Sequence, residues 1–185
     1  MMNAHEQVLK SMRDLAEKFS QVGIKLQMPP ASNATLGTRY TDIDLGKMLA
    51  AEVKFDPKFT NPMHVYQGGF LCAIFDEAYG PLTYMAAERP VVTIEMSTTF
   101  LRPFTERDEF VIVRAEVVAQ SRTLLVLKAD ARNKKGKLIA TSTAHAVIAT
   151  DQALNRKQRD RPGITVKDQQ DGGHDEEGNE TAPAH

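Results

Sequence analysis

The sequence has few of the features that mark disulfide-linked, membrane-spanning or nucleic-acid-binding proteins. Its only cysteine, Cys72, has no partner within the chain, so an internal disulfide is excluded and a reducing compartment is expected. The formal net charge of -1 provides no excess of basic residues for nucleic acid or an anionic membrane surface. The chain contains no uncharged apolar run long enough to cross a bilayer, and its first residues lack the apolar core of a signal peptide. These absences indicate the cytoplasm as the location.

Metal-binding and nucleotide-binding motifs are also missing. The five histidines and the single cysteine are scattered without the spacing of metal ligands. The glycines do not form the phosphate-binding loop of nucleotide-dependent enzymes. We therefore expect neither a metal ion nor a prosthetic group.

The N-terminal segment predicts a helix followed by a loop. Residues 4–20 carry apolar side chains three or four positions apart, with charged residues between them. This spacing is typical of an amphipathic helix that lies on the surface of a domain. Residues 21–37 contain two consecutive prolines and several turn-forming residues, so we predict a loop there.

The C-terminal segment has a different composition from the rest of the chain. Residues 151–185 are polar, and from residue 168 onward they include no Leu, Ile, Val, Met or aromatic residue. Such a segment cannot bury enough apolar surface to offset the entropy lost on ordering, so we predict a disordered tail. The expected organisation is an N-terminal helix and loop (1–35), one domain (36–150) and this tail (151–185).

Residues 68–88 form the longest apolar stretch of the chain. Its interior carries only two charged residues, Asp76 and Glu77. A helix that is apolar nearly all round is buried by the structure that surrounds it, so we expect Asp76 to be buried, where an unpaired carboxylate is costly. Glu77 is expected to face solvent or to form a salt bridge. The pair Gly80-Pro81 is expected to kink or loosen the second half of the helix.

Most of the remaining domain is rich in β-branched residues that alternate with a period of two, as in strands. Short polar connections between several of these segments fit hairpin turns. The predicted strands are 38–45, 47–56, 91–102, 109–119, 123–133 and 138–149. One long buried helix between two and four strands favours an α+β fold in which an antiparallel sheet curls around that helix.

The order of elements and three residue patterns resemble hotdog-fold acyl-CoA thioesterases of the phenylacetate-pathway and hydroxybenzoyl-CoA type. Asn61 precedes the pair Gly68-Gly69 at the family's spacing, and Asp76 follows it at the spacing of the catalytic carboxylate. Residues 92–103, VTIEMSTTFLRP, are similar to the family's strand that ends in an aromatic residue or leucine, then arginine and proline. The resemblance implies the hotdog fold, a curled antiparallel sheet wrapped around one long central helix, to which this chain adds the N-terminal amphipathic helix.

The same resemblance implies hydrolysis of acyl-CoA thioesters to the free acid and CoA, with Asp76 as base or nucleophile and CoA as part of the substrate. The amide at the helix start, at Gly68, would polarise the thioester carbonyl. Along one helix these two residues are roughly 12 Å apart, too far to contact a single carbonyl group. In the resembling family the carboxylate and the amide come from opposite subunits, which implies a homodimer or homotetramer.

Further site residues follow from the resemblance. Thr93 matches a Ser or Thr that orients the nucleophilic water, and Asn61 would hold the helix start or that water. Gly69 is expected to contribute to substrate binding beside the helix start. Arg102 and Arg122 are candidates for binding the CoA phosphates, although solvated positions at the edge of the sheet account for them nearly as well.

One position departs from the family pattern, because Gln67 stands where members usually have His. Gln67 is either part of the catalytic machinery or a helix-start residue without a chemical role. This departure motivates an alternative function, a non-catalytic acyl-CoA-binding or regulatory hotdog module. Asp76 has an alternative role as well, as an interface carboxylate bonded to backbone or to Asn61. A hydratase would need an Asp–His pair, for which His64 and His145 do not match the motif.

Overall fold

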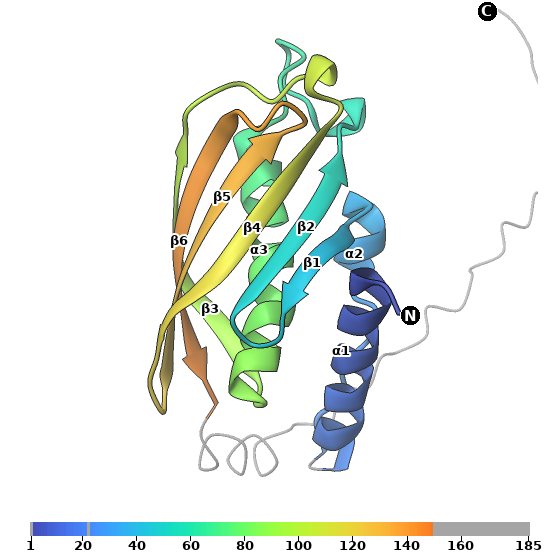
Figure 1. Ribbon diagram of the computed structural model, residues 1–185, viewed down its shortest axis with the longest axis vertical. Coiled ribbons are helices and arrows are strands. Elements are labelled where there is room, and N and C mark those ends of the chain that lie inside the picture. Colours follow the sequence, from blue (N-terminus) through green and yellow to red (C-terminus); the bar gives the residue numbers. More distant parts are fainter. Residues whose placement is uncertain (1, 22, 150–185) are drawn as a thin grey trace, which may run out of the picture.

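The computed structural model describes residues 2–21 and 23–149, in which a curled antiparallel sheet wraps around one long helix (Figure 1). The six strands have the order β1-β2-β4-β5-β6-β3. The helices and strands are α1 (Ala4–Gln21), α2 (Ala31–Leu36), β1 (Arg39–Asp44), β2 (Met48–Lys54), α3 (Gly68–Ala87), β3 (Val91–Phe100), β4 (Phe110–Gln120), β5 (Leu124–Asn133) and β6 (Leu138–Ile148), with short 3-10 turns η1 (Pro57–Phe59) and η2 (Glu106–Asp108).

The predicted α+β hotdog architecture is confirmed. The long helix and all six strands lie within one or two residues of their predicted bounds, because their apolar periodicity is strong. The predicted tail, residues 151–185, lies outside the described residues. Among the described residues, no helix combines the length and the apolar character needed to cross a membrane.

The prediction of an uninterrupted loop at 21–37 is wrong, because α2 forms within it. Pro30 occupies the N-cap in an extended conformation, and Gly37 ends the helix with a φ of 63°. A left-handed residue at this position lets the Gly37 amide bond back to the last turn, and glycine adopts it without a steric penalty. Six residues are too few to show helical periodicity, so only these end signals were available in the sequence.

The central helix α3 is covered by the sheet along one side. Apolar side chains on that side are at most 3% exposed, namely Leu71, Ile74, Phe75, Ala78, Tyr79 and Leu82. They meet the inward-facing residues of the strands, which alternate with outward-facing ones along β4 and β5. The helix continues as a single α-helix through Pro81, where a kink or loosening was expected. Because proline has no N–H, the carbonyl of Glu77 loses its intrahelical donor there.

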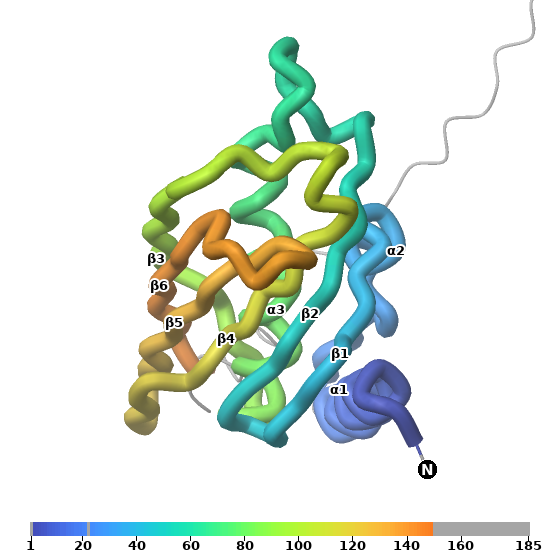
Figure 2. The backbone as a smooth tube through the Cα atoms, turned by 45° about the horizontal axis from the view of Figure 1, so that its top comes forward, coloured from blue at the N-terminus to red at the C-terminus, as the bar shows by residue number. Residues whose placement is uncertain are grey.

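The N-terminal helices cover another side of α3. Figures 1 and 2 show α1 and α2 together beside β1, at the flank of the sheet. The predicted amphipathic stripe of α1 is confirmed, with Val8, Met12, Leu15 and Phe19 at most 6% exposed. Helix α1 contacts both β1 and α3, and α2 contacts α3. We call the segment 4–40, without residue 22, the N-terminal cover.

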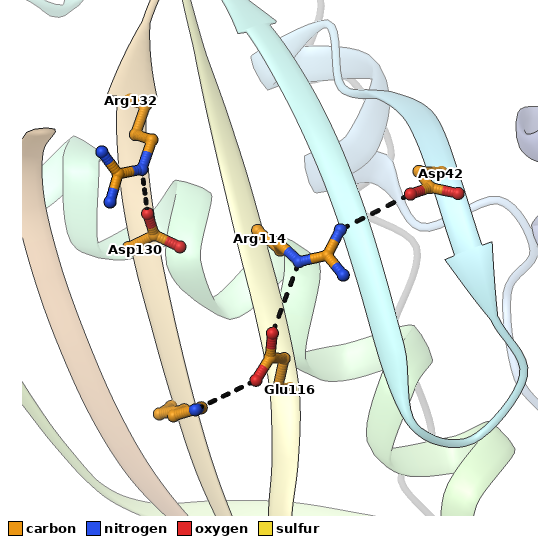
Figure 3. Close-up of polar contacts among 6 residues, drawn as sticks. Asp42, Arg114, Glu116, Asp130 and Arg132 are labelled. Carbon is orange, nitrogen blue, oxygen red and sulfur yellow. Dashed lines mark hydrogen bonds and ion pairs between the residues drawn. The ribbon is translucent and has the colours of Figure 1, made fainter. Parts of the chain in front are cut away.

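The outer face of the sheet differs between its two halves. Over β1, β2, β4 and β5 it is charged (Figure 3): Arg114 pairs with Asp42 at 3.5 Å and with Glu116 at 3.4 Å, and Arg132 pairs with Asp130. Over β3 and β6 it carries a pair of ionisable residues, Glu95 and His145, and exposed apolar side chains at the Val91 end of β3. Val92 on β3 lies opposite Val147 on β6, and they are 65% and 39% exposed. Strand β3 is also an edge of the sheet.

Candidate active site

Asp76 lies in the middle of α3 and is hydrogen-bonded to strand β3. The Thr93 hydroxyl donates to Asp76 Oδ1 at 3.1 Å. The expectation that Asp76 is buried is wrong, since its side chain is exposed in the single chain. The sheet ends at β3, so it does not enclose this side of α3. The carboxylate is therefore hydrated and accessible to a substrate, while one of its oxygens is fixed by a donor.

A β-bulge directs Thr93 towards the helix. The register between β3 and β6 shifts between Thr93 and Glu95, so Ile94 is an extra residue on β3. Bulges of this kind re-aim side chains and occur often beside active sites. Here Thr93 faces inward to α3, while Ile94 is 60% exposed and Glu95 bonds to His145 Nδ1 at 2.5 Å. His145 thus belongs to a contact between strands and not to the Asp76 site.

The start of α3 presents unpaired backbone donors. Gln67 is the N-cap; its carbonyl accepts from the amides of Phe70 and Leu71, and its side chain makes no capping bond. Within the described part of the chain, the amides of Gly68 and Gly69 have no acceptor. Such first-turn amides, at the positive end of the helix dipole, bind anions and carbonyl oxygens. The predicted helix-start donors are therefore present.

The two glycines at this start have different surroundings. A Cβ on Gly68 would lie 3.0 Å from Cζ of Phe100, so a side chain there would displace this ring. A Cβ on Gly69 would meet no atom within 4 Å. A side chain at position 68 would therefore need the Phe100 ring to shift, whereas one at position 69 would extend into open space.

Asn61 shapes the loop that leads into α3. Its side-chain oxygen accepts from the amides of Met63 at 2.9 Å and Val65 at 3.2 Å. Its own amide donates to the Val65 carbonyl at 2.8 Å, which closes a tight loop just before the helix. This arrangement fits the predicted role of holding the helix start. Asp76 does not bond to Asn61 within the described chain, where its hydrogen-bond partner is Thr93.

The two arginines proposed for CoA binding lie at opposite ends of the sheet. Arg102 follows the Phe100 end of β3, near the start of α3, and its Nη1 donates to the Leu138 carbonyl at 2.8 Å. Arg122 lies in the hairpin between β4 and β5, which the strand register places near the Val91 end of β3. Both are exposed. One chain therefore does not bring them to the same phosphate.

The contacts of Glu77, the charged residue next to Asp76, could not be predicted from the sequence. Glu77 is half-buried, and it accepts a hydrogen bond from Asn33 Nδ2 at 3.4 Å. Asn33 also donates to the Tyr40 hydroxyl at 3.2 Å. Burial raises the pKa of Tyr40 far above its usual range, and the nearby Glu77 carboxylate adds to this shift. The expectation that Glu77 faces solvent or forms a salt bridge is wrong.

A cavity of about 310 Å³ adjoins both carboxylates. It lies between α3 and the N-terminal cover, and Asp76 and Glu77 both line it. A hydrated carboxylate with one fixed oxygen can accept a proton from water or attack an electrophilic carbon. The adjoining cavity gives space for the group attached to that carbon.

Comparisons with known proteins support a common family and fold. The family model described as "Thioesterase superfamily" matches residues 64–140, which include Gln67, Asp76 and Thr93. A comparison with curated proteins finds no match. Among solved structures, the Escherichia coli PaaI protein of the phenylacetic acid degradation operon is 16% identical with a TM-score of 0.63, over 77% of this chain and 96% of that one.

Two further solved structures have the same architecture. A thioesterase from Haemophilus influenzae is 20% identical with a TM-score of 0.61, over 73% of this chain and 90% of its own. A phenylacetic acid degradation-related protein from Ralstonia eutropha JMP134 is 25% identical with a TM-score of 0.60, over 70% of this chain and 98% of its own. The matched segment holds the central helix with its exposed carboxylate, and the sheet that curls around this helix completes the hotdog fold. Over residues 64–140 the chain resembles the thioesterase superfamily.

Proposed function

We propose that the protein hydrolyses acyl-CoA thioesters to the free acid and CoA, with Asp76 as base or nucleophile. The observation that carries this proposal is the hydrogen bond from Thr93 to an exposed Asp76 carboxylate on the central helix. A carboxylate placed there for structure alone would pair with a cation or with backbone donors. Asp76 instead has one hydroxyl donor among the described residues, and it lines a cavity.

The reaction needs a donor for the carbonyl oxygen in addition to Asp76. The unpaired amide of Gly68 is suited to this role, and one such donor contributes roughly 3–4 kcal/mol to transition-state stabilisation. Oδ1 of Asp76 holds Thr93, which leaves Oδ2 for the reaction. Asp76 either takes a proton from the attacking water or attacks the carbonyl carbon itself; in the second case, water then hydrolyses the anhydride. In both routes the C–S bond breaks, and the CoA thiolate leaves and takes up a proton.

Two chains are needed to bring these groups to one substrate. Within a chain Asp76 follows Gly68 by eight positions on one helix, which places them roughly 12 Å apart. We infer a homodimer, alone or within a tetramer, in which the β3 edges meet and the helix start of one chain faces Asp76 of the other. Exposed apolar side chains lie at the two ends of β3 and at the start of α3: Val92, Ile94, Phe100, Leu101, Phe70 and Met63. Large exposed apolar groups beside an unpaired strand edge are typical of an interface.

The remaining predicted residues act on substrate placement in this proposal. Gln67 carries an exposed side-chain amide without a capping bond, so it is free to contact the thioester at the position of the family's His. Gly69 allows the substrate to approach the helix start. Arg102 and Arg122 are exposed cations at the two ends of the β3 edge, where CoA phosphates would bind. Because they are far apart in one chain, each would serve a different end of the CoA site.

The test is release of CoA thiol from a panel of acyl-CoA thioesters that differ in length, branching and aromaticity. Asp76→Asn is expected to lower kcat by about 10²- to 10⁴-fold, the usual contribution of a general base. Asp130→Asn is the matched control, since it removes a carboxylate on the outer face of the sheet (Figure 3). Full activity of Asp76→Asn, or loss of activity in both variants, would contradict the proposed role.

The non-catalytic acyl-CoA-binding module is the second candidate, and Gln67 is the observation that favours it. It predicts that acyl-CoA raises the Tm of the protein while no thiol is released from any panel member. Turnover by the wild type with at least one thioester excludes this candidate. Gln67→His distinguishes the two further, because gain of turnover in that variant alone would show that the wild-type residue prevents catalysis.

A further inference from the structure

The cavity beside Asp76 is bounded by one stripe of the central helix. Its lining residues on α3 include Ala73, Asp76, Glu77, Gly80 and Tyr84, which are spaced by three or four and therefore share a helical face. This stripe is separate from the one that packs on the sheet. The family match begins only at residue 64, so the opposite wall comes from a part of the chain that the match does not include.

The opposite wall is the N-terminal cover. It contributes apolar side chains from α1, from the segment after it and from α2, namely Met12, Leu26, Met28 and Leu36. Thioether and aliphatic groups of this kind bind apolar acyl groups without requiring one fixed shape. The volume of about 310 Å³ is at the lower end of the range for ligand sites, which fits a short acyl group.

The charge of the cavity excludes the CoA half of a thioester. Two carboxylates, Asp76 and Glu77, line it, and none of the described residues that line it is Lys or Arg. CoA phosphates would be repelled here, whereas a neutral or positively charged acyl group would not. The cavity is continuous with the reacting carboxylate, so its occupant is the acyl group of the thioester that reacts at Asp76.

Glu77 gives the cavity a specific polar contact. Its carboxylate receives one hydrogen bond within the described chain, the long one of 3.4 Å from Asn33. An ionised carboxylate has about four acceptor positions, so most of its capacity is unfilled. Asn33 is 8% exposed and also donates to the buried Tyr40 hydroxyl, so its side chain is held in one position. It therefore contacts the Glu77 carboxylate from one fixed side. A hydroxyl or ammonium group on the substrate would fill the remaining acceptor positions.

We propose that this cavity is the acyl subsite, and that Glu77 selects short acyl groups that carry a hydroxyl or ammonium donor. The N-terminal cover forms its outer wall and, through Asn33, positions Glu77. This inference rests on the proposed function, because it assigns the acyl half of the same thioester. Substrate choice then depends both on Glu77, inside the family match, and on the N-terminal cover that precedes the match.

Gly80 allows the cavity to be filled without disturbing the core. A Cβ on Gly80 would meet no atom within 4 Å, and its backbone is helical, so larger residues extend into the open space. In the series Gly80→Ala, Gly80→Val and Gly80→Leu, kcat/KM for butanoyl- and hexanoyl-CoA is expected to fall by about 10- to 100-fold relative to acetyl-CoA as the side chain grows. An unchanged chain-length profile in Gly80→Leu would overturn the assignment.

A variant that enlarges the cavity has a matched control on α1. Met28→Ala removes a lining side chain, whereas Leu9→Ala removes a partly buried side chain of the N-terminal cover that does not line the cavity. Met28→Ala is expected to shift the preference towards longer acyl groups, and Leu9→Ala to leave it unchanged. Equal shifts in both variants would indicate a general loosening of the cover and would contradict the proposal.

The role of Glu77 is tested with acyl-CoA thioesters of equal length that end in a methyl, hydroxyl or amino group. The wild type is expected to prefer the hydroxyl and amino forms by kcat/KM. Glu77→Met is expected to lower kcat/KM for the hydroxyl and amino forms to the value for the methyl form, and Glu77→Gln to lose mainly the preference for the amino form. No preference in the wild type, or an equal loss on all three substrates in Glu77→Met, would overturn the proposal.

Binding separates failure of this inference from failure of the proposed function. S-alkyl-CoA thioethers with the same three end groups cannot be hydrolysed, so their affinity can be measured by calorimetry whether or not the protein turns over thioesters. A wild-type preference for the hydroxyl and amino thioethers that Glu77→Met abolishes supports the subsite even without turnover. Turnover without this preference in affinity or rate leaves the proposed function intact and removes the inference.

Discussion

The two sides of α3 differ in what covers them. The side against the sheet is apolar and closed, with Phe75 and Tyr79 fully buried. The side against the N-terminal cover carries Asp76 and Glu77 and borders a cavity. Residues that are adjacent in the sequence thus lie in different environments. A substitution on the closed side is expected to reduce stability, and a substitution on the open side is expected to reduce function.

The sharpest test of this difference uses two neighbouring residues. Phe75→Ala is expected to lower the free energy of unfolding by about 3–5 kcal/mol, because it leaves a cavity in a closed core. Asp76→Asn is expected to change it by less than about 0.5 kcal/mol, as for other exposed positions, while activity falls by orders of magnitude. Urea unfolding and thiol release of both variants give the comparison. A large loss of stability in Asp76→Asn would show that the open side is structural after all.

The open side is expected to be completed by a second chain. Ile94→Asp places a charge at the exposed apolar edge, so we expect monomers and a loss of activity of at least about 100-fold. Light scattering after size-exclusion chromatography measures the oligomeric state. Leu45→Asp, at an exposed apolar residue in the turn between β1 and β2, is the control and should leave both properties unchanged. An active monomer would contradict the site between two chains.

The hydroxyl that fixes Asp76 has a smaller expected effect. Thr93→Val keeps the shape of the side chain and removes the donor of the 3.1 Å hydrogen bond. A hydrogen bond to a charged group contributes about 1.5–3 kcal/mol, so kcat is expected to fall by roughly 10- to 100-fold. Thr93→Ser should recover most of the rate because it restores the donor. Equal rates for the valine and serine variants would assign Thr93 to packing alone.

The smallest predicted effect is a gain in stability on the open side. Gly80→Ala adds a methyl group that meets no atom within 4 Å apart from its own helix backbone and chain neighbours, and alanine is favoured over glycine inside a helix by about 1 kcal/mol. A rise in Tm of about 2–4 °C is expected by scanning calorimetry. A fall in Tm would mean that the helix backbone beside Pro81 does not accept a side chain.

The architecture was predictable from the sequence because its strands and long helices carry strong periodicity. The resemblance singled out Asp76 and Thr93, but it gave Thr93 the role of orienting water and did not predict its hydrogen bond to Asp76. The exposure of Asp76 did not, because an apolar helix pattern does not show which of its sides is covered by its own chain. The contact of Glu77 with Asn33 joins residues 44 apart in the sequence, on a short helix with no periodic signal, so no local pattern could reveal it.

The bulge at Ile94 has a consequence for how many chains can join. A regular strand edge accepts any other regular strand, and further strands can then be added without limit. The bulge in β3 interrupts the regular spacing of its backbone hydrogen-bonding groups. A partner strand can pair along the whole edge only if it has a bulge at the matching position. A second β3 related by a two-fold axis meets that condition and leaves no free edge on that side. In the proposed homodimer, the irregularity that turns Thr93 towards Asp76 would thus also protect the sheet against open-ended polymerisation.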